Sequence, residues 1–473
     1  MFSTETYSQR RQTLRRRLAG QSGLLVFPGN ELCPMNYADN PFPFRQDSTF
    51  LYYFGLDVPS LAAVMDLDAG TETLYGDDPT VEQVVWTGPQ SALAERAARC
   101  GLTQTACREA LGQTVRNACR QGRPVHLLPP YQAQHLLALS ELLEVPCAQV
   151  RRHVSEPFAR AVIAMRSIKS AEEIEQIRQA VEITRRMHQT AMEHTAPKVT
   201  ENEVVAAMEQ VVIAHHGRMA FPVIFTIHGQ FLHNHYSANP LGEGDLVIND
   251  SGAENAMHYA ADITRTLPVS GRFTPRQRDM YELVLSALNQ SLDAVAPGVL
   301  FRDIHLAACC ILAEGLKSLG LMKGNVEDAV ACGAHALFFP CGLGHMLGLD
   351  VHDMEGLNEE WVGYTDTIQR SEQFGLRSLR LAKTLEPGFV LTVEPGVYFI
   401  PALIEHWEKT RQLTDYINYN KVREYLDFGG IRIEDNVLVT SDGQDVLSRA
   451  IPKSRQEVET LTGNRTKKGN RVG

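Results

Sequence analysis

The stretch that decides the fold is residues 246–266, which read LVINDSGAENAMHYAADITRT. Two apolar runs flank a polar connection, and this pattern predicts a β-hairpin. Each run carries an aspartate, Asp250 and Asp262, and twelve positions separate the two. In such a hairpin the carboxylates can lie opposite each other on one face, about 5 Å apart. Carboxylates that close repel each other unless a cation or a shared proton lies between them.

Three later segments supply groups of the same kind. His345 follows a glycine-containing stretch, and Glu394 ends an apolar run before Pro-Gly. The stretch Ile-Arg-Ile-Glu that ends at Glu434 alternates like a strand, so Arg432 and Glu434 share a face. With the two aspartates these groups contribute about four negative charges, which matches two divalent ions. Mostly oxygen ligands favour manganese, cobalt or zinc over iron-sulfur or copper chemistry.

The sequence around these segments predicts a helix-helix-sheet unit that is used twice. Capping signals predict four helices, whose first turns begin at Ser170, Thr200, Thr274 and Asp303. A strand-rich stretch follows each pair, at residues 221–267 and 328–440. We therefore expect residues 161–460 to form an α+β domain with pseudo-twofold repeats.

The N-terminal part of the chain predicts a separate domain, because 473 residues exceed what one hydrophobic core usually spans. Short apolar runs predict strands at residues 24–27, 51–54, 62–65 and 84–86. Helical patterns follow at residues 89–120 and 131–144. We expect an α/β domain over residues 1–160 and a flexible tail over residues 461–473.

Composition excludes several classes of function. The formal net charge of −11 opposes nucleic-acid binding, and the arginines of residues 10–17 suit the solvated face of a short helix. No apolar run approaches the roughly 18 residues of a membrane span. Nine cysteines include no Cys-x-x-Cys pair, which indicates reduced thiols. We expect a cytoplasmic protein without nucleic-acid or membrane partners.

In combination, these motifs resemble those of the pita-bread metallopeptidases. The matching stretches are Asp250 with Asp262-Ile-Thr-Arg-Thr, Gly-Leu-Gly-His345-Met-Leu-Gly-Leu-Asp-Val-His352-Asp, Thr-Val-Glu394-Pro-Gly and Gly-Ile-Arg-Ile-Glu434-Asp. The stretch PFRQDSTFLYYFGL at residues 43–56 similarly resembles the non-catalytic domain of aminopeptidase P. The likeness covers most of residues 20–450 and identifies the chain as a member of the aminopeptidase P (Xaa-Pro aminopeptidase) group.

The resemblance implies a ligand set and a reaction. Asp250 would bind one metal ion, His345 and Glu394 the other, while Asp262 and Glu434 would bridge both. Manganese is the expected metal, with cobalt or zinc as alternatives. A hydroxide held between the two ions would hydrolyse the bond before a proline at the second position of a peptide and release the N-terminal residue.

The resemblance also implies three further site residues. A histidine at the positions of His233 and His352 would contact substrate and help to stabilise the tetrahedral intermediate. His235 competes with His233 for this role. Arg432 is expected to orient a bridging carboxylate.

The sequence departs from the family pattern in three ways. The aspartates are one residue further apart than is usual, which predicts a bulge or an odd-length turn in the hairpin. Cys341 stands where relatives commonly carry histidine. Residues 356–386 and 399–429 are longer connections than the common core needs, as in lids or subunit contacts. Relatives are commonly dimers or tetramers, so we expect a homodimer or homotetramer.

Rival functions remain open at this level. A prolidase would accept only Xaa-Pro dipeptides, but residues 43–56 favour aminopeptidase P. A methionine aminopeptidase would not need the N-terminal domain. A pseudo-peptidase that serves as a binding module would be expected to lack metal ligands, and none of the five is missing.

Overall fold

The computed structural model describes residues 1–462. All but the first two residues of the expected tail, 461–473, therefore lie outside the described residues. The chain divides into two compact units. The first comprises Met1–Arg166 with Met354–Trp361, and the second Ser167–Asp353 with Val362–Gly473. None of the described helices is both long enough and apolar enough to cross a membrane.

The first unit is built on a five-stranded mixed sheet of order β4-β3-β2-β1-β5. Its strands are β1 Leu24–Pro28, β2 Ala62–Asp66, β3 Thr71–Tyr75, β4 Gln104–Ala106 and β5 Val125–His126. Helices α5 (Arg108–Arg120) and α6 (Ala133–Leu143) supply apolar side chains to a core shared with β1 and β2. The predicted α/β character of this part is confirmed.

Two of the four predicted N-terminal strands are wrong. Residues 51–54 belong to helix α2 (Ser48–Phe54), in which Asp47 caps the first turn and every side chain is buried. Residues 84–86 belong to helix α3 (Val81–Thr87), in which no side chain is buried. Apolar runs this short carry no usable periodicity, so a buried strand and a short helix look alike in sequence.

The basic N-terminal run also differs from expectation. It lies on helix α1 (Thr4–Arg17), but Arg10 and Arg11 are buried. The Arg11 guanidinium donates to the Glu72 carboxylate at 2.7 Å and to two backbone carbonyls. A planar guanidinium can be buried where several acceptors match its donors, and the run is therefore not a wholly solvated face.

The second unit contains the two predicted helix pairs. They are α9 (Ala171–His194) with α10 (Glu201–Ala214), and α11 (Pro275–Ala294) with α12 (Phe301–Ser318). The capping boxes at Ser170, Thr200 and Thr274 are confirmed. Asp303 is not the cap of α12: Leu300 takes that position and Asp303 lies in the first turn. An acid stabilises either position through the helix dipole, so the sequence does not separate them.

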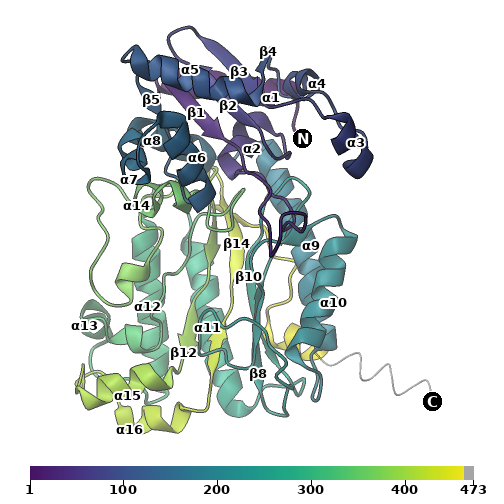
Figure 1. The fold of residues 1–473 in the computed structure, drawn as a ribbon. Coiled ribbons are helices and arrows are strands. Elements are labelled where there is room, and N and C mark those ends of the chain that lie inside the picture. The colour runs from purple at the N-terminus through teal and green to yellow at the C-terminus, as the bar shows by residue number, and fades with distance from the viewer. Residues whose placement is uncertain (463–473) are drawn as a thin grey trace, which may run out of the picture. The chain divides into compact units, whose positions relative to one another are not determined.

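Each helix pair has its own group of strands. The strands are β6 Arg218–Met219, β7 Ile224–Thr226, β8 Leu246–Ser251, β9 Ala253–Glu254, β10 Ile263–Pro268, β11 Val390–Val393, β12 Gly396–Tyr398, β13 Gly430–Arg432, β14 Asp435–Val439 and β15 Gln444–Val446. Helix α9 contacts β8, β9 and β10, whereas α11 contacts β11, β12, β13 and β15. The two pairs flank the central strands β8, β10 and β14 (Figure 1). The helix-helix-sheet unit is thus used twice.

Shorter elements complete the chain. They are α4 Leu93–Arg99, α7 Cys147–Val150, η1 Arg151–His153, α8 Glu156–Ser167, α13 Val326–Ala331, η2 Ala334–Leu337, η3 Glu355–Leu357, α14 Glu359–Gly363, η4 Leu376–Ser378, α15 Pro401–Lys409, α16 Tyr419–Val422, η5 Arg423–Tyr425 and α17 Arg455–Leu461. The long connections at residues 356–386 and 399–429 are therefore folded into short helical turns.

The register of the β8–β10 hairpin differs from the simplest expectation. Asp250 pairs with Thr264, so Asp262 lies two positions further along, diagonal to Asp250 on the same face. An odd-length turn at residues 256–258 produces this register. The Asn255 amide donates to the carbonyl of Tyr259 at 3.0 Å, and His258 adopts a left-handed φ of 66°.

Candidate metal centre

The five residues predicted as metal ligands lie close together in the second unit. Asp250, Asp262 and Glu434 form one group, and His345, Glu394 and Glu434 form another. Within each group the ligand atoms all lie within 4.8 Å of one another. Glu434 belongs to both groups, so the arrangement is that of two adjoining sites.

The ligands stand at strand ends that come from both halves of the unit. Asp250 lies near the end of β8 and Asp262 directly precedes β10. Glu394 lies between β11 and β12, and Glu434 lies between β13 and β14. Asp250 is paired within the β8–β10 ladder, and Asp262, Glu394 and Glu434 directly adjoin strand residues, so the strands fix the positions of these four side chains.

The imidazole of His345 is held in one orientation. Its backbone amide donates to the Thr392 hydroxyl at 3.1 Å, and Nδ1 lies 3.0 Å from the carbonyl of Met346. A carbonyl only accepts, so Nδ1 carries the proton and the lone pair is on Nε2. That atom lies 3.4 Å from a carboxylate oxygen of Asp262 and 3.6 Å from one of Glu394.

Two carboxylate oxygens of the ligand set receive no hydrogen bond from the described residues. The Thr264 hydroxyl donates to Oε2 of Glu434 at 2.7 Å, and Asn436 exchanges two hydrogen bonds with the backbone of Asp262. The other oxygens, Oδ1 of Asp262 and Oε1 of Glu434, are buried and have no hydrogen-bond partner among the described residues. Buried oxygens without donors suit a cation, and they fall on the two residues expected to bridge both ions.

The electrostatics of the protein alone leave these acids poorly stabilised as anions. Burial raises the pKa of Asp262 well above its ordinary value, and the nearby charge of Asp250 adds to this effect. Burial likewise raises the pKa of Glu394 and of Glu434, and neighbouring carboxylates add to it. Divalent cations among the carboxylates would offset both causes, so the donor set fits such ions.

Arg432 contacts the ligand Asp250 directly and the ligand Glu434 through a hydroxyl group. It forms an ion pair with Asp250 at 2.5 Å, donates to the Thr264 hydroxyl at 3.0 Å and donates to the Tyr398 hydroxyl at 2.8 Å. It reaches Glu434 only through the Thr264 hydroxyl. Asp250 is a one-metal ligand in the expected scheme, and the orienting role of Arg432 towards a bridging carboxylate stays a prediction, which its link to Glu434 through Thr264 supports.

The two predicted substrate histidines lie beside the ligands. The ring of His352 has its centroid 4.0 Å from that of His345, and His352 groups with Asp262 and His345 as a candidate ligand. Burial lowers the pKa of His233, and Arg432 and Asp250 are close enough to act on it as well. His233 is therefore within electrostatic reach of the ligands, whereas no described contact ties His235, which is exposed like His233, to them.

Several supporting residues were not predicted from sequence. Thr264, Thr392, Tyr398 and Asn436 all fix a ligand or Arg432. Strand alternation was the available signal for Thr264, which is two positions from Asp262 and hence on the same face.

Arg265 is a further supporting residue, and its side chain is fully buried behind the ligands. All five of its N–H donors are used. They reach the carbonyls of Thr264, Glu434, Ile451 and Pro452 and the carboxylate of Asp435. The guanidinium therefore ties β10 to the segment that carries Glu434.

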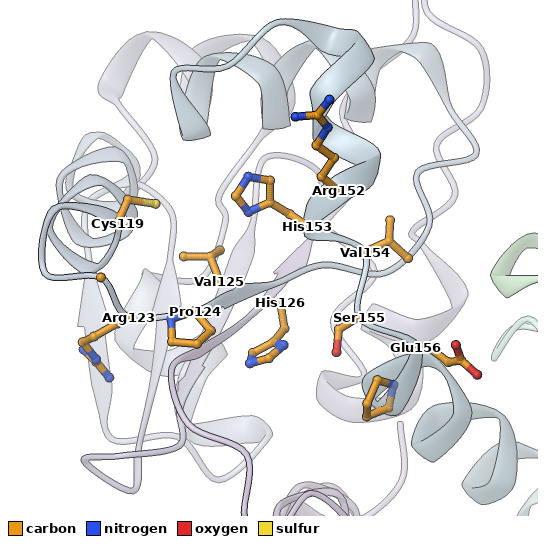
Figure 2. Close-up of a pocket in the computed structure, with 12 residues that line it drawn as sticks. Cys119, Arg123, Pro124, Val125, His126, Arg152, His153, Val154, Ser155 and Glu156 are labelled. Atoms are coloured by element: carbon orange, nitrogen blue, oxygen red, sulfur yellow. The ribbon is translucent and has the colours of Figure 1, made fainter.

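A separate groove lies in the first unit (Figure 2) and has a volume of about 540 Å³. It is lined by Cys119 and by residues 122–126 and 152–157. Its Arg123 is already paired with Asp66 and Asp68 at 2.6 Å. None of the predicted catalytic or metal-binding residues lines this groove, so it does not belong to the candidate centre.

Two family models match this chain. The model of metallopeptidase family M24 matches residues 175–441, and that of the aminopeptidase P N-terminal domain matches residues 7–126. The probable Xaa-Pro aminopeptidase of Metarhizium acridum is 32% identical over 481 residues, covering 94% of this chain and 91% of that protein. One from Aspergillus fumigatus is 32% identical over 459 residues, with the same coverage of 94% and 91%.

Solved structures give the same result for the fold. A variant of Escherichia coli aminopeptidase P in complex with substrate is 28% identical, has a TM-score of 0.79, and is matched over 98% of this chain and 99% of that one. A zinc-substituted form in complex with product is 29% identical, with a TM-score of 0.78 and coverage of 97% and 98%. Aminopeptidase PepP of Pseudomonas aeruginosa is 26% identical, with a TM-score of 0.79 and coverage of 98% and 99%.

The predicted pita-bread fold with an aminopeptidase P N-terminal domain is thereby confirmed. The M24 model spans more than half of the chain, and the curated relatives are more than 30% identical over nearly all of it. The chain therefore belongs to metallopeptidase family M24, as a metalloexopeptidase of the aminopeptidase P type.

Proposed function

We propose that this metalloexopeptidase releases the N-terminal residue from peptides whose second residue is proline, with two divalent ions held by Asp250, Asp262, His345, Glu394 and Glu434. The observation that carries the proposal is the sharing of Glu434 by two ligand groups. It is supported by the buried carboxylate oxygens of Asp262 and Glu434, which lack a hydrogen-bond partner among residues 1–462.

The charge of the ligand set supports two ions. Four carboxylates and one neutral imidazole carry about four negative charges, which two divalent cations neutralise. When bound, such ions lower the pKa of a water held between them towards about 7 and polarise the scissile carbonyl. The oxygen-rich donor set favours manganese, with cobalt or zinc as alternatives.

The protein's own groups would orient the ligands and the substrate. Arg432 holds Asp250 in place, while the Nδ1 contact of His345 directs its Nε2 towards the carboxylates. His352 and His233 lie next to the ligands, and their rings would donate hydrogen bonds to the substrate. A donor aimed at negative charge that develops on the carbonyl oxygen contributes about 3 kcal/mol to catalysis.

The preference for proline follows from the relatives and from the chemistry of the bond. The curated relatives are named Xaa-Pro aminopeptidases. Proline has no amide hydrogen and a fixed φ angle, so a general protease that grips its substrate as an extended strand handles this bond poorly. A dedicated site is the physical solution.

The test compares Ala-Pro with Ala-Pro-Ala as substrates of metal-stripped protein before and after addition of Mn²⁺. Cleavage of the tripeptide that depends on Mn²⁺ supports the proposal. Cleavage of the dipeptide alone would identify a prolidase instead. The absence of both cleavage and bound metal would identify a pseudo-peptidase that acts as a binding module.

The proposal includes a cytoplasmic location and an assembly of two or four copies. All nine cysteines are free thiols, which suits a reducing compartment. Helix α3 exposes Val81, Val85 and Trp86 by 83%, 74% and 80%, and clustered apolar side chains are typical of contact surfaces. Light scattering on the purified protein measures the number of copies.

A further inference from the structure

A second group of candidate ligands lies outside the proposed active site. It consists of His305 and Cys309, one turn apart on α12, and His335 on η2. Their ligand atoms all lie within 4.8 Å of one another, and Sγ of Cys309 is 3.5 Å from Nε2 of His305. The three residues are 0%, 0% and 2% exposed.

The nitrogens of this cluster are not satisfied by the protein. Neither ring nitrogen of His335 has a hydrogen-bond partner among the described residues, and Nδ1 of His305 has none either. The carbonyl of Val330 is close enough to act on the pKa of His335, but it does not accept a hydrogen bond of ordinary geometry. A buried polar group without a partner costs about 1–3 kcal/mol, and an ion bound to one ring nitrogen of His335 would remove this cost at that atom.

The cluster is also electrically neutral and ready to bind a metal. Burial lowers the pKa of His305 to about 3 and that of His335 to about 4, so both rings keep free lone pairs at neutral pH. Burial raises the pKa of the Cys309 thiol well above its ordinary value. Apart from the backbone of Val330 and of Cys309, the groups that act on these three are histidine and cysteine side chains; no carboxylate, lysine or arginine among residues 1–462 does so.

We propose that His305, Cys309 and His335 bind one Cu(I) ion. On binding, the Cys309 thiol releases its proton to solvent and a bond forms between Sγ and the ion, with no change of oxidation state. One thiolate and one monovalent ion leave the pocket neutral, whereas a divalent ion would leave a net positive charge in an apolar interior. Thiolate and imidazole are the donors that Cu(I) prefers.

The geometry fits a shared ion. A sulfur and a nitrogen bound to one ion, at the bond lengths of about 2.3 and 2.1 Å that zinc sites show, lie about 3.6 Å apart at a tetrahedral angle. Sγ of Cys309 and Nε2 of His305 are 3.5 Å apart as a hydrogen-bonded pair, so an ion can replace the thiol proton with little movement of either side chain. The oxygen-rich active site and this sulfur- and nitrogen-containing cluster therefore select metals of opposite character.

Residues 373–375, within the long connection 356–386, cover the cluster. Gly375 has a left-handed φ of 88°, and a Cβ there would lie 2.6 Å from Cβ of Ala336 and 3.7 Å from Nε2 of His335. The left-handed φ and the close approach to Ala336 require glycine here, and this backbone places residue 375 in van der Waals reach of the ring. The side chain of Gln373 holds this segment in place, because its amide group donates a hydrogen bond to the carbonyl of Ala331 at 3.1 Å.

The test is an anaerobic titration of the full-length, reduced, Mn²⁺-loaded protein with Cu(I), in competition with a Cu(I) chelator that strips exposed thiols. We expect one Cu(I) per chain to be retained. X-ray absorption should show one sulfur and two nitrogen neighbours, and the melting temperature should rise. Failure to retain copper, or preferential filling of the cluster by Zn²⁺ in a parallel titration, would overturn the proposal.

Variants assign the copper to these residues. Cys309→Ala and His335→Phe should each lower the Cu(I) affinity at least 100-fold. Cys310→Ala changes the adjacent thiol, which lies outside the cluster, and should retain the wild-type affinity. Circular dichroism without copper checks that each variant is folded. If Cys309→Ala does not fold, His335→Phe still tests the proposal. Wild-type affinity in both cluster variants would show that His305 and His335 are ordinary buried histidines.

Discussion

Glu434 is the ligand whose role in the proposed metal centre can be tested most directly by a single substitution. It belongs to two of the ligand groups, as Asp262 and His345 do, it is 1% exposed, and one of its oxygens lacks a hydrogen-bond partner in the described part of the chain. Its loss would remove a ligand from both groups at once.

We predict that Glu434→Ala abolishes turnover of Ala-Pro-Ala, by at least 1,000-fold in kcat, since removal of the shared ligand disrupts both ions. Bound manganese measured by elemental analysis should fall in parallel. The fold should persist, as circular dichroism can show. Near-wild-type activity would rule out the bridging role, and the exposed Glu424→Ala provides the control.

Arg432 offers a prediction of a different kind. Its guanidinium reaches Asp250, Thr264 and Tyr398 at once, whereas the point charge of lysine can reach only one of them. Arg432→Lys should weaken Mn²⁺ binding about 10–100-fold while activity largely recovers at high Mn²⁺. The measurement is activity against Mn²⁺ concentration, with Arg423→Lys on the surface as control. An unchanged Mn²⁺ dependence would contradict the positioning role.

Cys341 lies beside the metal centre. Burial raises the pKa of its thiol to about 12, and the charge of Glu394 adds to this, so the thiol is protonated and a poor nucleophile at neutral pH. We expect Cys341→His, which restores the residue common in relatives, to preserve or raise the rate on Ala-Pro-Ala. A tenfold loss of kcat would show instead that the thiol has a function of its own.

At the scale of elements, His188 joins helix α9 to strand β8 by hydrogen bonds. Nε2 of this histidine lies 3.0 Å from the carbonyl of Ser251, and Nδ1 lies 3.2 Å from the side-chain nitrogen of Asn249. Burial lowers the pKa of His188 to about 3. The helix-sheet contact therefore depends on a histidine that must stay neutral.

This gives a pH dependence of stability. Below the unfolded pKa of about 6.5 the unfolded chain binds a proton that the folded chain does not accept until about pH 3. The free energy of unfolding should therefore fall by about 1.4 kcal/mol per pH unit within this window. In urea titrations at pH 6.5, 5.5 and 4.5, His188→Gln should lose that part of the slope, whereas the exposed His406→Gln should not. Equal slopes in His188→Gln and wild type would refute the assignment.

Elements with strong local signals were predicted well from the sequence. The helices that begin after Ser170, Thr200 and Thr274 have reciprocal caps and long apolar stripes, and all three are confirmed. The apolar runs at residues 51–54 and 84–86 were assigned wrongly, because four or fewer residues cannot distinguish a strand from a helical turn.

For the site, the sequence predicted which residues come together but not the detailed contacts between them. The sequence placed Asp250 and Asp262 on one face, but their diagonal register depends on a turn whose shape is set by the left-handed His258. Arg432 was expected to orient a bridging acid, and the sequence did not show that it binds Asp250 directly and reaches Glu434 through Thr264. Which acid a long side chain reaches is decided by tertiary packing between strands far apart in sequence, and no local pattern records it.

At the scale of the whole molecule, the carboxylates make metal binding part of stability. Their raised pKa values mean that ions must displace protons at low pH, so binding should strengthen as the pH rises. A ligand at about 100 times its Kd stabilises the folded state by about 2.7 kcal/mol. The second unit should therefore unfold more readily after chelation.

Trp407 can report on this unit alone, because Trp86 and Trp361 belong to the first unit. In a Trp86→Phe, Trp361→Phe variant, Mn²⁺ should raise the melting temperature followed by Trp407 fluorescence, and by more at pH 8 than at pH 5. The EDTA-treated Glu434→Ala form of this variant is the control. If the melting temperature is the same with and without Mn²⁺ at both pH values, the result would argue against a metal pair within the unit.

The buried Arg265 has a consequence for how the repeated architecture may be divided. It belongs to the first half of the second unit, yet four of its acceptor residues, Glu434, Asp435, Ile451 and Pro452, belong to the second half. If the halves were expressed as separate polypeptides, the guanidinium of Arg265 in the first half would lose four of its five acceptors, and Asp435 in the second half would keep Lys453 but lose Arg265 as a partner. The repeat is therefore symmetrical in form but indivisible as a folding module.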